Sequence, residues 1–305
     1  MKSFVVRFLN RVSLLVGGWF IGFFAWWVST GYFLLKGSRR RASMELYEVV
    51  FPGRSYLYHL YCTWRQFHSF AATYSDRVRL HSLPKAISST KGRENLLELA
   101  RIGKGGVIVM SHLGSYEIAA TCFQGLGLKL LLFLGEREAK QVARDQREAM
   151  MAKGIHIHVS NGMDNASFGG LEALRFIREG GFVSLAGDLV WTDQRTRVPV
   201  RFFDREVGFT SAPHLIAMVA GAPLLTMFTY RAQNGVHRIE ILPPREVKAP
   251  TRAERDLTIQ ASAQAYASAL EGMIRKHPFQ WYVFEPFFPS AVSKEEPHSC
   301  TCSRL

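Results

Sequence analysis

Residues 106 to 117 read GVIVMSHLGSYE, and this stretch decides how the rest of the chain is interpreted. The apolar run from Gly106 to Met110 predicts a buried strand, and residues 118–126 predict a helix shortly after it. His112 and Glu117 therefore fall at the carboxyl end of a strand, where open α/β proteins place their chemistry. An imidazole at such a position can take a proton from a hydroxyl near neutral pH, and a nearby carboxylate can fix its tautomer.

The spacing of His112 and Glu117 leaves two interpretations open. On one continuous helix, residues five positions apart point about 140° away from each other. The two side chains meet more easily if His112 lies in the turn and Glu117 in the first helical turn. Gly114, between them, allows the backbone to approach a ligand closely. The alternative is a structural histidine beside a carboxylate that the helix dipole favours.

The pattern after about residue 95 alternates short apolar runs with helical segments, which predicts an α/β fold with a mostly parallel central sheet flanked by helices. The expected strands are 106–110, 128–134, 155–159, 182–186, 198–203, 224–230 and 237–242, with a candidate last strand at 281–284. The expected helices in this part are 118–126, 138–153, 171–179, 211–219 and 255–276. Before it, residues 42–80 are typical of amphipathic helices, with a break at Pro52-Gly53.

The net charge of +13, from 38 Lys and Arg against 25 Asp and Glu, favours an anionic partner. Residues 12–35 carry no charge and are rich in aromatic side chains. This segment is about long enough to span a bilayer, and its aromatic content also suits a helix lying at the lipid interface. We therefore expect a hydrophobic membrane-anchoring helix with basic flanks in residues 1–41, a catalytic domain in 42–290 and a polar, disordered tail in 291–305.

Several motifs in the same order resemble one family. They are SHLGSYE at 111–117, Pro52-Gly53, AGD at 186–188, VPVRFFDREVGFT at 198–210 and GAPLLTMFTYR at 221–231. Together with the N-terminal apolar run, they resemble the bacterial late lipid A acyltransferases, the lauroyl- and myristoyltransferase family of the lysophospholipid acyltransferase superfamily. SHLGSYE corresponds to the HxxxxD/E motif of that family. The resemblance covers roughly residues 1–290.

The resemblance implies transfer of a fatty acyl chain from a thioester, acyl carrier protein or acyl-CoA, to a hydroxyl of a membrane glycolipid similar to lipid A. His112 would be the general base, and Glu117 would orient it. Asp188 follows the predicted strand 182–186, so it is a rival for that role; its alternative is a carboxylate that caps a turn. The resemblance also implies the inner (cytoplasmic) membrane, with the catalytic domain on its cytoplasmic face.

Three arginines are candidates for substrate binding. Arg147 lies in the charged helix 138–153, where the family tends to carry an arginine, and could bind a phosphate or an oxyanion. Arg197 and Arg201 belong to a basic strip that suits an anionic headgroup or membrane surface. The alternative for each of them is a solvated basic surface. No cofactor is implied, and His156 and His158, which share one face of a strand, lack further ligands at metal-binding spacing.

Two other functions remain open. The family commonly carries basic residues after its C-terminal tryptophan, whereas Trp281 is followed here by Phe284, Glu285 and Pro286. The acceptor could therefore be another glycolipid, a phospholipid or a polyene-type lipid. The other function is a membrane protein that binds anionic lipid without turnover. Nucleic acid is disfavoured as a partner, because no recognised binding motif is present and the aromatic residues concentrate in apolar runs.

Overall fold

The computed structural model describes residues 18–79, 87–135, 148, 150–152, 154–160, 166–189 and 197–289. In chain order the elements are α2 (Gly18–Leu35), α3 (Gly37–Val50), α4 (Tyr56–Arg79), β1 (Ile87–Lys91), α5 (Arg93–Arg101), β2 (Gly106–Met110), α6 (Tyr116–Leu126), β3 (Leu130–Gly135), β4 (Ile155–Ser160), α9 (Ala166–Arg178), β5 (Phe182–Ala186), β6 (Arg197–Phe202), β7 (Arg205–Thr210), α10 (Ala212–Ala220), β8 (Leu224–Arg231), β9 (His237–Ile241), a 3-10 turn (Arg252–Glu254) and α11 (Arg255–Lys276). Most of the predicted helix 138–153 and the predicted tail 291–305 lie outside the described residues.

The strands form a seven-stranded sheet in the order β1-β9-β8-β2-β5-β3-β4 within the described part of the chain. Strands β8, β2, β5, β3 and β4 run parallel to one another. Strand β9 pairs antiparallel with β8, and β1 pairs with β9 in parallel at the edge of the sheet. This confirms the expected α/β fold with a mostly parallel sheet. The sequence did not predict β1 or α5, and β1 is a short polar strand, ISSTK, at the sheet edge.

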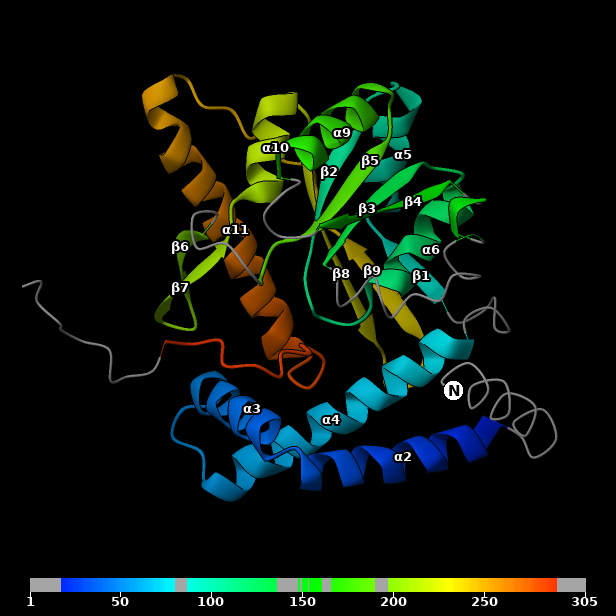
Figure 1. The fold of residues 1–305 in the computed structure, drawn as a ribbon, viewed down its shortest axis with the longest axis vertical. Coiled ribbons are helices and arrows are strands. Elements are labelled where there is room, and N and C mark those ends of the chain that lie inside the picture. Colours follow the sequence, from blue (N-terminus) through cyan, green and yellow to red (C-terminus); the bar gives the residue numbers. More distant parts are fainter. Residues whose placement is uncertain are drawn as a thin grey trace, which may run out of the picture.

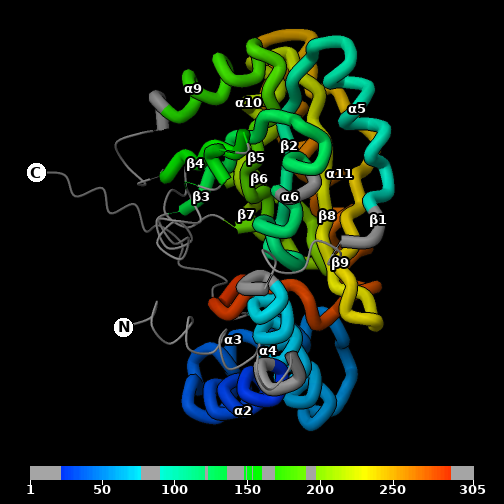
Figure 2. The backbone as a smooth tube through the Cα atoms, turned by 90° about the vertical axis from the view of Figure 1, so that its right-hand side faces the viewer, coloured from blue at the N-terminus to red at the C-terminus, as the bar shows by residue number. Residues whose placement is uncertain are grey.

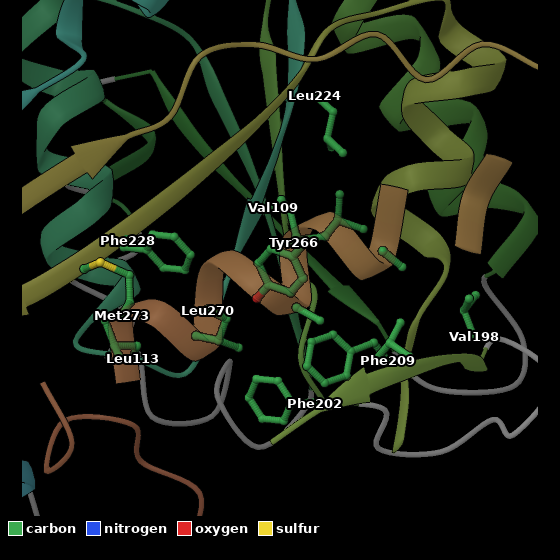
Figure 3. Packing of buried hydrophobic residues seen from close by; sticks show 14 of the residues in the cluster. Val109, Leu113, Val198, Phe202, Phe209, Leu224, Phe228, Tyr266, Leu270 and Met273 are labelled. Carbon is green, nitrogen blue, oxygen red and sulfur yellow. The ribbon is translucent and has the colours of Figure 1, made fainter. Parts of the chain in front are cut away.

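Both faces of the sheet are covered, which explains why β2 reads as an unbroken apolar run. Successive side chains of a strand point to opposite faces. Val107 and Val109 belong to the core beneath α9, α10 and α11, whereas Ile108 and Met110 belong to the core beneath α5 and α6. Figure 3 shows the first of these cores, where Tyr266 and Leu270 of α11 lie close to Val109.

The predicted strand at 198–203 does not join the large sheet. It is the first strand of a separate hairpin, β6–β7. Side chains along β6 alternate between exposed and buried, and the buried Phe202 and Phe209 pack in the core below α11. Phe203 and Asp204 form the two-residue tip with φ angles of 50° and 59°, the left-handed geometry that a tight hairpin turn requires.

Helices α2, α3 and α4 form a layer at one end of the molecule (Figures 1 and 2). Helix α2 lies along α4, and their contact includes an edge-to-face pair of Phe33 and Phe67 with ring centroids 5.6 Å apart. The Pro52-Gly53 break separates α3 from α4, as predicted. Residue 41, the predicted end of the N-terminal segment, falls inside α3. No helix in the described part of the chain combines the length and the apolar character needed to cross a membrane.

The segment after α11 runs between this helical layer and the sheet, where Figures 1 and 2 show it in orange-red. The prediction of a strand at 281–284 was wrong: within it, only Trp281 forms an isolated bridge, with Leu113. The segment is instead held by single hydrogen bonds from side chains of the helical layer. The Tyr47 hydroxyl donates to the Pro278 carbonyl at 2.9 Å, and the Gln66 side-chain amide donates to the Trp281 carbonyl at 2.6 Å.

Candidate active site

His112 lies in the loop that joins the end of β2 to the start of α6. Its side chain is 23% exposed, so it is accessible while the strand that leads to it is buried. Its neighbour in space is the end of β5, because β2 and β5 pair in parallel register with Met110 opposite Ala186. His112 lies two residues beyond Met110, and Asp188 lies two residues beyond Ala186, so the two residues follow neighbouring strand ends.

Asp188 is fully buried and its carboxylate accepts three hydrogen bonds. The Nδ1 atom of His112 lies 2.9 Å from Asp188 Oδ1, and the backbone N–H of His112 donates to Oδ2 at 2.8 Å. The Trp281 indole N–H donates to Oδ2, also at 2.8 Å. A buried carboxylate requires such partners, and this arrangement fixes the orientation of the His112 ring through Nδ1.

The charge balance at Asp188 follows from these contacts. Burial raises the pKa of the Asp188 carboxyl, but the attraction of His112 and the hydrogen bonds from His112 and Trp281 outweigh burial and leave the pKa below its ordinary value. Below the pair, the Tyr266 hydroxyl donates to the Met110 carbonyl at 2.7 Å. Burial, followed by the negative charge of Asp188, raises the Tyr266 pKa well above 10.0. Tyr266 therefore stays protonated and anchors the end of β2.

Gly187 permits the close approach of the two strand ends. Its N–H donates to the Met110 carbonyl at 2.8 Å. A Cβ atom at this position would lie 2.4 Å from Val109 Cγ2 and 2.7 Å from a ring carbon of Tyr266. Real Cβ contacts are not this short, so any larger residue would displace Asp188 or α11.

Gly114 and Thr229 set the path of the loop on the other side of His112. Gly114 has φ of 75°, and a Cβ atom there would lie 2.1 Å from the Thr229 carbonyl oxygen. The Thr229 hydroxyl accepts from the Ser115 N–H at 3.0 Å and faces the Leu113 carbonyl at 3.3 Å. One side chain of β8 thus holds the whole turn from Leu113 to Ser115.

The segment after α11 closes the back of the site. The N–H of Tyr282 donates to the His112 carbonyl, and the N–H of Gly114 donates to the Gln280 carbonyl, each at 2.9 Å. The Tyr282 hydroxyl reaches Ser69 and Thr73 of α4 at 3.0 and 2.8 Å. Sequence reasoning did not assign Trp281 or Tyr282 to the site; the only signal was the match of Trp281 to the C-terminal tryptophan of the resembling family.

Glu117, the other predicted carboxylate, lies in the first turn of α6 and is 3% exposed. The Tyr116 hydroxyl donates to its Oε1 at 3.4 Å. The sequence predicts that His112 and Glu117 meet most easily with His112 in the turn and Glu117 in the first helical turn, and the two residues have these positions. The Nδ1 atom of His112, however, faces Asp188.

The predicted arginines have different surroundings. Arg147 lies outside the described residues. Arg197 and Arg201 share the exposed face of β6, and Arg201 pairs with Asp204 at 2.9 Å. Arg197 lines a cavity of about 190 Å³ that also contains Leu189, next to Asp188, and Tyr282, next to Trp281.

A second cavity, of about 320 Å³, lies between the start of α3 and the segment after α11. Its lining includes Arg39, Arg41, Phe284 and Glu285. Phe284, Glu285 and Pro286 line both this cavity and the one beside Asp188. The two cavities therefore flank the same short stretch of the segment after α11, one beside the helical layer and the other beside Leu189.

Metal chemistry has no obvious centre in the part of the chain that is described, where no group of three or more His, Cys, Asp and Glu residues could hold an ion. His158, one of the two histidines considered for a metal, instead pairs its Nδ1 with Glu172 Oε2 at 2.5 Å. The other, His156, packs against the Phe176 ring. The arrangement that can carry chemistry is the histidine–carboxylate pair at the ends of β2 and β5, which is suited to general acid–base catalysis.

Comparison with known proteins identifies one matching family. A family model described as bacterial lipid A biosynthesis acyltransferase matches residues 19–289. The match includes both strand ends of the site, the hairpin and the segment after α11. No curated protein matches the chain.

Proposed function

The chain belongs to the bacterial lipid A biosynthesis acyltransferase family, which implies acyl transfer to a lipid A precursor, and from this premise we propose the donor, the catalytic residues and the location. The donor is an acyl thioester carried by acyl carrier protein or coenzyme A. The acceptor is a hydroxyl of a lipid A-like glycolipid. His112 is the general base, Asp188 is its orienting partner, and the protein acts at the cytoplasmic face of the inner membrane.

The proposed reaction needs no acyl-enzyme. His112 Nε2 takes the proton of the acceptor hydroxyl as the oxygen attacks the thioester carbonyl. The tetrahedral intermediate then breaks its C–S bond, and His112 returns the proton to the departing thiolate. Asp188, held at Nδ1, stabilises the imidazolium between the two steps. A general base of this kind contributes about 10²–10⁴ in rate.

The observation that carries the proposal is the hydrogen bond from His112 Nδ1 to the buried Asp188. It supports Asp188 rather than Glu117 as the orienting carboxylate, because an imidazole offers only one hydrogen on Nδ1. Glu117 remains a candidate for orienting His112, from a buried position in the first turn of α6.

The helical layer supports membrane docking. Helix α2 turns one face to α4 and exposes Phe23, Trp27 and Leu35 on the rest of its surface. Lys36 and Arg39, directly after α2, lie over the ring of Tyr32 at 5.9 and 5.5 Å. Exposed aromatic and aliphatic side chains next to cations suit a helix lying in the headgroup region of an anionic membrane.

The two cavities beside the segment after α11 support an acceptor that enters from this layer. Arg39 and Arg41 can meet an anionic headgroup in the 320 Å³ cavity, and the 190 Å³ cavity continues toward Leu189. Arg197 lines the 190 Å³ cavity, whereas the predicted roles of Arg147 and Arg201 in substrate binding rest on the sequence alone.

Glu285 favours a second candidate acceptor. It lines both cavities, and its carboxylate would face the acceptor headgroup. Together with Glu45 it offsets the charges of Arg39 and Arg41 in the 320 Å³ cavity, which favours a less charged glycolipid or a polyene-type lipid over a bisphosphorylated disaccharide. The reaction and the catalytic pair are the same for either acceptor.

The test is an acyl-transfer assay with the purified full-length protein, acyl carrier protein thioesters and either a lipid A precursor or a bacterial lipid extract. We expect His112→Ala to lose about 10²–10⁴ of the rate with an unchanged circular dichroism spectrum. Full activity in that variant would reject His112 as the base. Mass spectrometry of the lipid product decides between the two acceptors.

A further inference from the structure

A cavity of about 580 Å³ lies beside β6, α10 and the first part of α11. Three arginines line it: Arg197 at the start of β6, Arg252 in the 3-10 turn and Arg255 at the start of α11. The remaining lining includes the apolar side chains Val198, Pro199, Leu215, Leu257 and Ile259.

The cavity is positively charged. Asp256 is the only carboxylate among its lining residues within the described chain. None of the ion pairs formed among the described residues involves Arg197, Arg252 or Arg255. Three guanidinium groups around one cavity repel each other unless an anion binds between them. The planar guanidinium group can donate two parallel hydrogen bonds to a phosphate.

The cavity adjoins a second cavity at Arg197. This residue also lines the 190 Å³ cavity that contains Leu189 and Tyr282. A second connection runs through Ser211, a lining residue that directly follows Thr210. The N–H of Thr210 donates to the carbonyl of Gly187 at 3.3 Å, one residue before Asp188.

The cavity lies on the side of the domain away from the helical layer. Figures 1 and 2 show the beginning of α11 at the end opposite to α2, α3 and α4. Arg255 is the first residue of α11, and Arg252 belongs to the 3-10 turn that directly precedes it. A lipid headgroup held at the membrane surface by that layer would not be presented to this end. The matching anion is therefore part of a water-soluble substrate.

We propose that Arg197, Arg252 and Arg255 bind the phosphate group of the phosphopantetheine arm that carries the acyl thioester. This inference rests on the proposed function, because it assigns the binding site of the thioester donor. Acyl carrier protein and coenzyme A share this chemistry: a phosphate separated from the thioester by a long, flexible, mainly neutral chain. The phosphate would bind between the arginines while the arm passes Arg197 toward His112.

The experiment compares three donors that carry the same acyl chain: acyl carrier protein, coenzyme A and pantetheine without phosphate. The variant is Arg252→Ala/Arg255→Ala. The matched control is Arg101→Ala/Lys104→Ala, which removes two exposed cations at the end of α5. We expect kcat/KM of the first variant to fall about 10- to 100-fold with both phosphorylated donors, and to fall much less with acyl-pantetheine. The control should stay near the wild-type values with all three.

A binding measurement separates this inference from the proposed function. Calorimetry should detect 4′-phosphopantetheine binding to the wild-type protein, and weaker binding to Arg252→Ala/Arg255→Ala, whether or not transfer occurs. A wild-type protein that uses no thioester would overturn the proposed function. The phosphate site would be overturned if the wild-type protein uses thioesters but Arg252→Ala/Arg255→Ala loses activity equally with all three donors. It would also be overturned if that variant loses activity with only one of the two phosphorylated donors.

Discussion

Two regions of the molecule differ in which side chains they bury. The ends of β2 and β5 bury a charged group, whereas the helical layer of α2–α4 exposes large apolar side chains. At the strand ends, Asp188 is fully buried and accepts three hydrogen bonds from groups far apart in the sequence. On α2 and α4, large apolar side chains such as Trp27, Leu35 and Leu57 remain exposed. The first region is organised for one fixed geometry, and the second offers apolar surface to something outside the protein.

The segment after α11 connects the two regions. Tyr282 donates its N–H to His112 and turns its hydroxyl to Ser69 and Thr73 of α4. Gln66 of α4 holds the carbonyl of Trp281, whose indole holds Asp188. Helix α4, which packs against α2, is therefore joined by a short chain of hydrogen bonds to the residues proposed for catalysis.

The largest expected effect is that of Asp188→Asn, which removes the negative charge while keeping the shape of the side chain. We expect a loss of about 10³–10⁴ in kcat, because an amide stabilises the wrong tautomer of the imidazole and cannot stabilise the imidazolium. Glu117→Gln, measured in the same acyl-transfer assay, should lose less. If Glu117→Gln is inactive and Asp188→Asn is active, the assignment of the orienting carboxylate is reversed.

The second effect is on the backbone of the same region. Gly114→Ala should lower the free energy of unfolding by about 3 kcal/mol, because the left-handed φ costs about 1–2 kcal/mol and the contact with Thr229 adds about 1–3 kcal/mol. Urea denaturation measures this change. Gly53 has a similar φ but no atom within 4 Å of the added Cβ, so Gly53→Ala should cost only the first part. Equal costs would show that the Thr229 contact is relaxed without penalty.

The third effect is the pH dependence of stability caused by His214, a buried residue of α10 in the domain that carries the catalytic pair. Burial lowers the pKa of His214 to about 4, below its value of about 6.5 in an unfolded chain. Between these values the unfolded state binds a proton that the folded state does not. Stability is therefore fully present above pH 6.5 and falls as the pH drops toward 4, by about 2–3 kcal/mol.

The variant for this third prediction is His214→Gln, which keeps a partner for Ser262, 2.8 Å from His214 Nδ1. Denaturation midpoints measured from pH 7 to pH 4.5 should fall less steeply for this variant than for the wild-type protein. Parallel slopes would mean that other groups, and not His214, cause the pH dependence in this range.

The smallest effect concerns the helical layer. Trp27→Ser/Leu35→Ser should weaken binding to vesicles of phosphatidylethanolamine and phosphatidylglycerol about tenfold, because shallow insertion at the headgroup region gains only part of the about 1.5–3 kcal/mol that full burial of each side chain would contribute. Leu171→Ser/Val219→Ser removes two exposed apolar side chains from α9 and α10 and serves as the control. Sedimentation with the vesicles measures both. Equal losses in the two variants would argue against a specific role for α2.

Local patterns predicted most of the elements. The run 182–186 matched β5, and the helix 255–276 matched α11, because each has a clear period and clear ends. The polar strand β1 was missed because its residues do not alternate between apolar and polar. The hairpin β6–β7 was predicted as a strand but not as a separate sheet, since strand pairing depends on contacts that no local pattern contains.

The sequence by itself determined that the chain is an α/β protein, that His112 follows a buried strand, and which family its ordered motifs resemble, because these depend on local periodicity and on motif order. Only the tertiary structure decided that Asp188 faces Nδ1 of His112 and that Trp281 completes the carboxylate's hydrogen bonds. These three residues lie 76 and 93 positions apart. They meet because β2 and β5 are neighbours in the sheet, and strand order is set by packing of the whole domain.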